Sequence, residues 1–159
     1  MKKNRIIPDI VKAIKNNKKI YLRSPNSTRP WQHVLEPLFG YLKLGSLLMK
    51  NNLKNIINPS WNFGPYKKNC VKVKVISSMI LNNFSISQKN IIKSKKKKFK
   101  EANLLSLNIK KASKELKWKP KLSLKETINL TTDWYKSYYR GSNMIKFTKS
   151  QIDYFLNKK

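Results

Sequence analysis

The sequence predicts an α/β protein in which short strands alternate with helices, and two observations support this. Short runs of β-branched and aromatic residues, such as Lys19–Arg23, end in turn-forming residues, as strands do. Longer segments repeat apolar residues at helical spacing, and one of them opens with a serine and a glutamate three residues apart, Ser123 and Glu126. With 159 residues the chain is long enough for one domain with a hydrophobic core.

The helical spacing predicts five helices along the chain. They are expected at Pro8–Lys15, at Leu35–Lys50, from an N-cap at Asn108 to a stop at Pro120, from Ser123 to Gly141, and after a second capping motif at Thr148–Gln151. A weaker pattern at Val71–Leu81 alternates and then becomes helical.

Short strands are expected between these helices. The candidates are Lys19–Arg23, an extended segment at Arg29–Val34, Ser60–Pro65 before a Gly-Pro turn, and Ala102–Asn108. Residues 87–100 are rich in lysine, and because dense like charges repel one another we expect a solvated loop there.

The net charge of +29 suggests a nucleic-acid-binding module as one class of function. Four of the 36 basic residues are arginines, so 32 are lysines, whereas nucleic-acid recognition relies strongly on arginine. Lysine, asparagine and isoleucine are abundant together throughout the chain. We interpret the charge as compositional background and keep nucleic-acid binding as the alternative.

Several other classes find no support in the sequence. It contains no apolar run long enough to span a membrane, no signal-peptide pattern and no glycine-rich nucleotide motif. One histidine and one cysteine cannot form a zinc site, and the single Cys70 cannot form an internal disulfide. We therefore expect a cytoplasmic protein with no metal site and no catalytic residue of its own.

The rarer residue types gather in one stretch, Asn26–Gly45. It holds one of four arginines, the only histidine, one of four tryptophans and two of four glycines. These residues mark either a ligand site or a packed junction between a strand and a helix. For His33 we expect a hydrogen-bonded, partly buried side chain, and for Gly40 and Gly45 close helix packing or a helix end.

Six motifs in order along the chain resemble the carboxyl-terminal half of CDP-glucose 4,6-dehydratases. They are "RIIPDIVKAI", "STRPWQHVLEPLFGYLKLG", "WNFGP", "EANLLSLN", "ASKELKWKP" and "TTDWYKSYYRG". These enzymes are extended short-chain dehydrogenase/reductases that act on sugar nucleotides. "RPWQHVLEPL" is the most specific motif, because it separates this family from related dehydratases and epimerases.

The resemblance implies a carboxyl-terminal substrate-binding lobe with a residual part of the Rossmann sheet, namely the strand that ends at Asn62–Gly64. The amino-terminal half, with the glycine-rich NAD-binding turn and the Tyr-x-x-x-Lys catalytic pair, would be missing. The family uses NAD to convert CDP-glucose to CDP-4-keto-6-deoxyglucose for surface polysaccharides, so this chain alone would be inactive. A homodimer or a separate cofactor domain would be its partner.

The resemblance also implies five substrate-binding residues. Arg29 matches the family's phosphate-binding position, and Asn62 matches a polar position at the same part of the nucleotide. Arg5 and Tyr21 match segments that line the nucleotide pocket, and Glu101 matches a segment near the substrate.

The sequence departs from the family pattern at three positions. Lys100, Asn108 and Lys117 stand where the family has histidine, aspartate and glycine. A non-functional gene fragment is therefore a second alternative, beside nucleic-acid binding.

Overall fold

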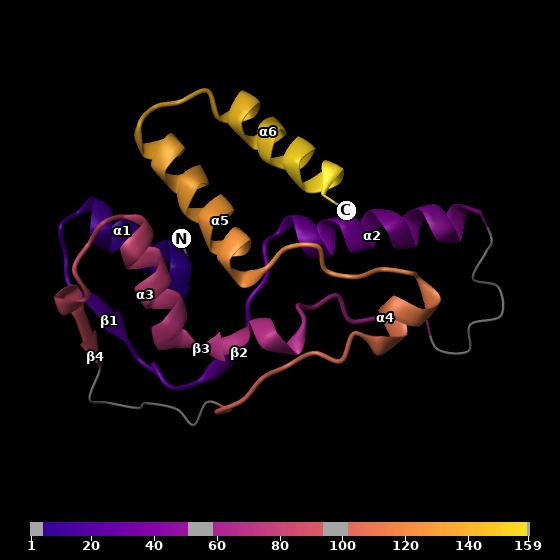
Figure 1. The fold of residues 1–159 in the computed structure, drawn as a ribbon, viewed down its shortest axis with the longest axis horizontal. Helices are drawn as coiled ribbons and strands as arrows, with labels where there is room; N and C mark the ends of the chain where they lie inside the picture. The colour runs from indigo at the N-terminus through magenta and orange to yellow at the C-terminus, as the bar shows by residue number, and fades with distance from the viewer. Residues whose placement is uncertain (1–4, 51–58, 94–101, 159) are drawn as a thin grey trace.

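The structure of the chain is a computed structural model that describes residues 5–50, 59–93 and 102–158 (Figure 1). The described part is mixed α/β and mostly helical, which confirms the predicted fold class. The α-helices are α1 (Ile6–Lys15), α2 (Leu35–Met49), α3 (Val73–Asn83), α4 (Lys110–Glu115), α5 (Leu124–Tyr139) and α6 (Met144–Asn157). The strands are β1 (Ile20–Leu22), β2 (Thr28–Pro30), β3 (Cys70–Lys72) and β4 (Ile91–Lys93), with 3-10 turns η1 (Lys67–Asn69) and η2 (Gln88–Asn90).

The strands form two small sheets. β1 and β4 are parallel, with Ile20 opposite Ile91. β2 and β3 are antiparallel, with Arg29 opposite Val71. Because β1 and β2 are consecutive in sequence and separated by a short turn, residues 20–30 connect the two sheets.

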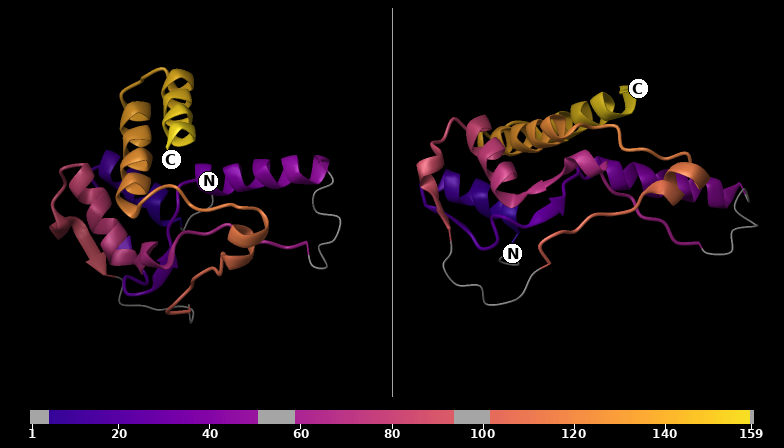
Figure 2. Two further views of the ribbon diagram at one scale, coloured as in Figure 1. Left: turned by 45° about the vertical axis from the view of Figure 1, so that its right-hand side comes forward. Right: turned by 60° about the horizontal axis from the view of Figure 1, so that its bottom comes forward.

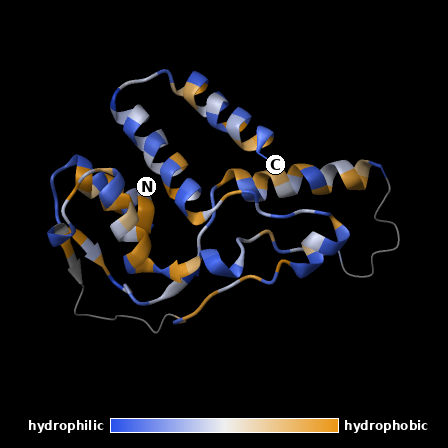
Figure 3. Cartoon of the chain, in the orientation of Figure 1, coloured by the Kyte–Doolittle hydropathy of each residue, from blue (hydrophilic) through white to orange (hydrophobic). Residues whose placement is uncertain are grey.

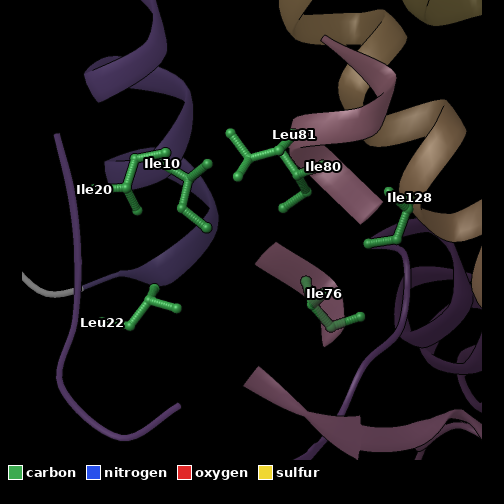
Figure 4. Packing of buried hydrophobic residues seen from close by; sticks show 7 residues of the cluster. All are labelled: Ile10, Ile20, Leu22, Ile76, Ile80, Leu81 and Ile128. Atoms are coloured by element: carbon green, nitrogen blue, oxygen red, sulfur yellow. The ribbon is translucent and has the colours of Figure 1, made fainter. Parts of the chain in front are cut away.

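The first hydrophobic core surrounds β1 and lies between α1, α3 and α5 (Figure 4). Its members are aliphatic side chains that are at most 3% exposed. They are Ile10, Ile20, Leu22, Ile76, Ile80, Leu81 and Ile128. These contacts place β1 and α1 beside each other, and their facing surfaces form the cleft described below.

The second core lies under α2, beside α4. Phe63, Leu116 and Trp118 form its centre, and the Phe63 and Trp118 rings meet edge to face at 5.1 Å. A Cβ atom on Gly40 would lie 2.4 Å from the Phe63 ring, so α2 can approach this core only with glycine there. The expectation of close helix packing is confirmed at Gly40. At Gly45 a Cβ would meet no atom within 4 Å.

A buried carboxylate joins α2 to the segment that leads into α5. Glu36 is 1% exposed, and its Oε1 accepts hydrogen bonds from the backbone N–H groups of Lys121, at 2.9 Å, and Leu122, at 2.7 Å. Burial raises the pKa of the Glu36 carboxyl, and these two hydrogen bonds partly oppose that shift. The other oxygen, Oε2, is buried and has no hydrogen-bond partner among the described residues.

The α5–α6 pair forms an antiparallel helical hairpin (Figure 2). The predicted capping box is confirmed, because the side chains of Ser123 and Glu126 each bond the other's backbone N–H. Glu126 also accepts from Tyr154 and pairs with Lys158, which ties the end of α6 to the start of α5. Lys158 and Ser123 together hold the pKa of the Glu126 carboxyl down at about 2.

The strand predicted at Ser60–Pro65 is absent, and with it the strand expected to end at Asn62–Gly64. The Phe63 ring packs in the second core. The Phe63 carbonyl accepts a hydrogen bond from the Gln32 side chain rather than from the backbone of a neighbouring strand. β3 takes the place beside β2. Ala102–Asn108 likewise forms no strand and contributes one isolated bridge, between Leu104 and Thr28.

Three helix starts differ from the predictions, and the first is that of α1, which begins at Ile6 instead of Pro8. α6 begins at Met144 rather than after Thr148, because Asn143 caps it by accepting from the Lys146 N–H at 3.1 Å. Thr148 instead accepts from the Trp134 indole, at 3.0 Å. The predicted Asn108 cap is shifted by one residue: the N-cap position is Ile109, while the Asn108 side chain accepts from Lys110 N–H.

The lysine-rich segment is described only in part. Residues 88–93 form η2 and β4 instead of the expected loop, because β4 pairs with β1. Residues 94–100 lie outside the described ranges. Within those ranges, no helix combines the length and apolar character that crossing a membrane requires.

Removing the Glu36 carboxylate tests its structural role. Glu36→Ala is expected to lower the free energy of unfolding by about 2–4 kcal/mol, because two backbone N–H groups lose their acceptor in the interior. Glu36→Gln retains an oxygen and is expected to stay within about 1 kcal/mol of the wild type. Urea unfolding followed by circular dichroism measures both. Equal stability of the two variants would contradict the role.

The depressed pKa of Glu126 predicts a pH dependence. A carboxyl with a pKa near 2 in the folded chain and 4.5 otherwise stabilises the fold above pH 4.5. That contribution is lost as the pH falls from 4.5 to about 2. The stability difference between the wild type and Glu126→Gln, from urea unfolding, should therefore shrink across this range.

Asp153→Asn removes an exposed carboxylate from α6 and is the charge-matched control. A Glu126→Gln difference that stays constant between pH 6 and pH 2 would rule out the proposed linkage.

Candidate functional site

A cleft of about 710 Å³ opens between α1, β1, β2 and the turn that joins the two strands. Three cationic side chains line it, Lys19, Arg23 and Arg29, together with one carboxylate, Asp9. The cleft therefore carries an excess of positive charge and favours an anionic ligand.

The alternation of β1 places an aromatic ring in this cleft. Ile20 and Leu22 point into the first core, whereas Tyr21, between them, is 66% exposed. Arg23, the first residue after β1, lines the same cleft. An aromatic ring and a guanidinium, two residues apart in the sequence, therefore both line the cleft.

Arg29 lies on β2 and also lines the cleft. Its Nη1 donates to the carbonyls of Thr28, at 2.9 Å, and Ala102, at 2.8 Å. The backbone of residues 103–105 also pairs with Thr28, through Asn103 O at 2.8 Å and Leu105 N at 3.1 Å. These contacts fix the orientation of the guanidinium at the cleft wall and attach residues 102–105 to β2.

Trp31 completes the aromatic part of the lining. It packs against the first core, and its indole N–H donates to Val71 O at 2.9 Å. It also lines the cleft, close to Arg29 along the chain. Two aromatic rings and two guanidinium groups therefore face one cavity, a composition suited to a ligand with both a planar ring and phosphate groups.

The structure brings together two of the five predicted site residues, Arg29 and Tyr21. Arg5 is exposed at the N-cap of α1 and does not line the cleft. Asn62 is exposed between Trp61 and Phe63, next to the second core and away from the cleft. Glu101 lies outside the described residues, so its predicted role stays a prediction.

The sequence analysis did not assign Arg23, Lys19 or Trp31 to the site. A signal for Arg23 was present, because it stands two residues after Tyr21 in a strand-like segment and so shares its face. Trp31 both packs against the first core and lines the cleft, a double role that the sequence alone does not show.

His33 and Cys70 do not line the cleft. His33 is buried, and its Nδ1 accepts from the Leu35 N–H at 3.3 Å, as expected for a hydrogen-bonded histidine. Burial lowers the pKa of its imidazole, which favours the neutral form.

Cys70 is half-buried, and burial raises the pKa of its thiol. Within the described ranges, no three His, Cys, Asp or Glu side chains are grouped so as to hold a metal ion.

Comparison with known proteins gives one clear sequence relative. The chain is 33% identical over 155 residues to CDP-glucose 4,6-dehydratase of Salmonella typhimurium. The match covers 98% of this chain and 42% of that protein, whose carboxyl-terminal part it represents. No family model matches the sequence. The resemblance stated from the motifs is thereby confirmed, for a chain that spans less than half the length of this relative.

Solved structures share the fold at lower identity. dTDP-glucose 4,6-dehydratase of Streptomyces venezuelae, with NAD bound, gives a TM-score of 0.68 at 16% identity, over 87% of this chain and 40% of that one. UDP-glucuronic acid 4-epimerase of Bacillus cereus, in complex with UDP-glucuronic acid and NAD, gives 0.69 at 22% identity, over 86% and 41%. Dehydratases and epimerases therefore match the fold equally well.

These comparisons show which part of the relatives the chain resembles. The chain is homologous to part of a sugar-nucleotide-modifying enzyme, and its structural neighbours were solved with NAD. Its fold corresponds to about two fifths of those neighbours.

Proposed function

We propose that the chain is the substrate-binding part of a CDP-glucose 4,6-dehydratase and that its cationic cleft holds CDP-glucose. The observation that supports this most directly is the position of Arg29. The family motif "RPWQHVLEPL" assigns this arginine to phosphate binding, and it lines the cleft that also contains Tyr21 and Arg23. In the complete enzyme the product would be CDP-4-keto-6-deoxyglucose, a precursor of sugars in surface polysaccharides.

The parts of the ligand correspond to the parts of the cleft. A diphosphate suits Arg29 and Arg23, because a guanidinium donates paired, charge-assisted hydrogen bonds to phosphate oxygens. The exposed ring of Tyr21 offers a face on which the cytosine base can stack. The cleft of about 710 Å³ lies within the range of pockets that hold ligands of this size.

NAD does not fit the residues of this chain. A dinucleotide site needs a glycine-rich turn between a strand and a helix. Gly40 and Gly45 lie within α2, Gly64 packs beside Leu107, and Gly141 follows α5. None of these four glycines is at such a turn. When bound to the complete enzyme, NAD supplies the hydride chemistry of the dehydration. The share of this chain is to bind and orient the sugar nucleotide.

The dehydratase assignment, rather than an epimerase one, rests on sequence. The structural neighbours include both activities at nearly equal TM-scores, so the fold does not separate them. The relative that is 33% identical over nearly the whole chain is a CDP-glucose 4,6-dehydratase. The base of the preferred nucleotide therefore distinguishes the two assignments.

Calorimetric titration of the chain with CDP-glucose tests the proposal. The wild type is expected to bind with 1:1 stoichiometry, with CDP as a competitor and UDP and dTDP as weaker ones. Arg23→Ala and Arg29→Ala should each weaken binding by about 10- to 100-fold, the range expected for hydrogen bonds to a charged group. Arg23→Ala is the cleaner variant, because Arg29 also holds Ala102.

Arg140→Ala is the matched control, since Arg140 is an exposed arginine beyond the end of α5. If it weakens binding as much as Arg23→Ala does, the ligand is held by general positive charge and the cleft assignment is wrong. No binding by a chain that circular dichroism shows to be folded would contradict the proposal. No binding by an unfolded chain would favour the gene-fragment alternative.

The nucleic-acid alternative predicts a different result in the same instrument. An RNA or DNA oligonucleotide would then bind more tightly than CDP-glucose, with an affinity that falls steeply with salt. Titrations at two salt concentrations separate the two proposals.

A further inference from the structure

The cleft proposed to hold a sugar nucleotide also contains a negative charge. Asp9, on α1, is the one carboxylate among the described residues that line it. Carboxylates are rare in this chain, which has seven acidic residues against 36 basic ones. Asp9 opposes the binding of a diphosphate in the same cleft, because like charges repel one another. Its presence there indicates a contact with a part of the ligand other than the phosphates.

The helical spacing of α1 places Asp9 in the cleft. Ala13, four residues later, lines the cleft as well, as do Ile6 and Ile10. α1 has both apolar and polar residues, as the orange and blue segments along it in Figure 3 illustrate. Ile10 is buried in the first core, whereas Asp9 beside it is exposed. The core thus holds the helix in place, and the helix presents the Asp9 carboxylate to the cleft.

A second hollow adjoins the cleft and gives it two different ends. This hollow has a volume of about 500 Å³ and shares Asp9, Lys19 and Tyr21 with the cleft. Arg23 and Arg29 line the cleft but not the second hollow. The cleft therefore has one end with the two guanidinium groups and another, beside the second hollow, with the carboxylate and the exposed tyrosine ring.

This arrangement matches the polarity of a pyrimidine nucleotide. The ribose is attached to N1 of the ring, and C4 lies opposite N1, so the substituent on C4 points away from the phosphates. In cytosine this substituent is an amine with two N–H donors, and in uracil and thymine it is a carbonyl oxygen. With the diphosphate at Arg23 and Arg29 and the base on Tyr21, the C4 substituent is directed toward the end of the cleft that contains Asp9.

We propose that Asp9 selects cytosine by accepting a hydrogen bond from its exocyclic amine. An ionised carboxylate only accepts hydrogen bonds, so it stabilises cytosine and repels the carbonyl oxygen of uracil or thymine. Carboxylates bind the same amine of cytosine in protein–DNA complexes. The inference rests on the proposed function, and it names the residue that makes the cleft prefer CDP to UDP and dTDP.

Lys19 is the competing group at this end of the cleft. Its ammonium group only donates hydrogen bonds, so it would favour the carbonyl oxygen of uracil. The sequence relative is a CDP-glucose 4,6-dehydratase, and a cytosine amine needs an acceptor, which Asp9 supplies and Lys19 does not. Lys19→Met is therefore expected to keep the preference for CDP.

Calorimetric titrations with CDP and UDP test the role of Asp9. The wild-type chain is expected to bind CDP about 10- to 100-fold more tightly than UDP, the discrimination typical of a specific contact to a base. In Asp9→Asn this ratio should fall to about threefold or less, because a carboxamide can offer its oxygen to cytosine or its N–H groups to uracil. The ratio is the decisive quantity, since removing a negative charge strengthens the binding of both diphosphates.

A third ligand separates attraction from repulsion. The diphosphate of pyrimidin-2-one riboside has a hydrogen atom on C4 in place of the amine or the carbonyl oxygen. It should bind the wild-type chain less tightly than CDP and more tightly than UDP. Asp153→Asn is the charge-matched control, because Asp153 is an exposed carboxylate on α6 that does not line the cleft. It should keep the wild-type ratio.

The inference is overturned if Asp9→Asn keeps the wild-type ratio, if Asp153→Asn lowers it equally, or if Lys19→Met abolishes it. In these cases the proposed function stands, provided that Arg23→Ala still weakens the binding of CDP. Equal affinity of the folded wild-type chain for CDP and UDP, or no binding of either, would contradict the inference and the proposed function together.

Discussion

The buried carboxylate of Glu36 is the contact on which the arrangement of this chain most depends. It accepts the backbone N–H groups of Lys121 and Leu122 and so fixes the start of α2 to the segment that enters α5. The first core takes Ile128 from α5, and the second takes the inner face of α2. Burying a carboxylate costs free energy, which these hydrogen bonds offset in part. The contact thus holds the two cores together.

The stretch Asn26–Gly45 gathers rare residues because three different demands meet there. Arg29, at its start, faces the cleft. His33 and Glu36, in its middle, are buried and hydrogen-bonded at the junction. Gly40, on α2, allows the helix to approach the Phe63 ring closely. The question whether these residues mark a ligand site or a packed junction therefore has a divided answer: Arg29 fits a site, whereas His33, Glu36 and Gly40 belong to a packed junction.

What could be predicted from the sequence follows the range of the interactions. The α5 capping box was predicted because both partners lie three residues apart. The prediction of a strand at Ser60–Pro65 was wrong because the Phe63 ring packs into a core built from segments distant in the sequence. Local sequence patterns cannot show such contacts. The prediction that Thr148 caps the last helix was wrong because its hydroxyl accepts a hydrogen bond from Trp134, which lies on another helix. In the site, Tyr21 and Arg29 were predicted from family motifs, whereas Arg23 was found only from the lining of the cleft, which distant segments build together.

The most direct test of this account is a titration of the isotopically labelled chain with CDP, followed by amide chemical shifts in nuclear magnetic resonance. The account predicts saturable shifts at residues 19–31 and at the facing residues of α1, with α6 unaffected. Weak, unsaturated shifts spread over lysines throughout the surface would contradict it. They would show that the chain binds anions only through its overall charge.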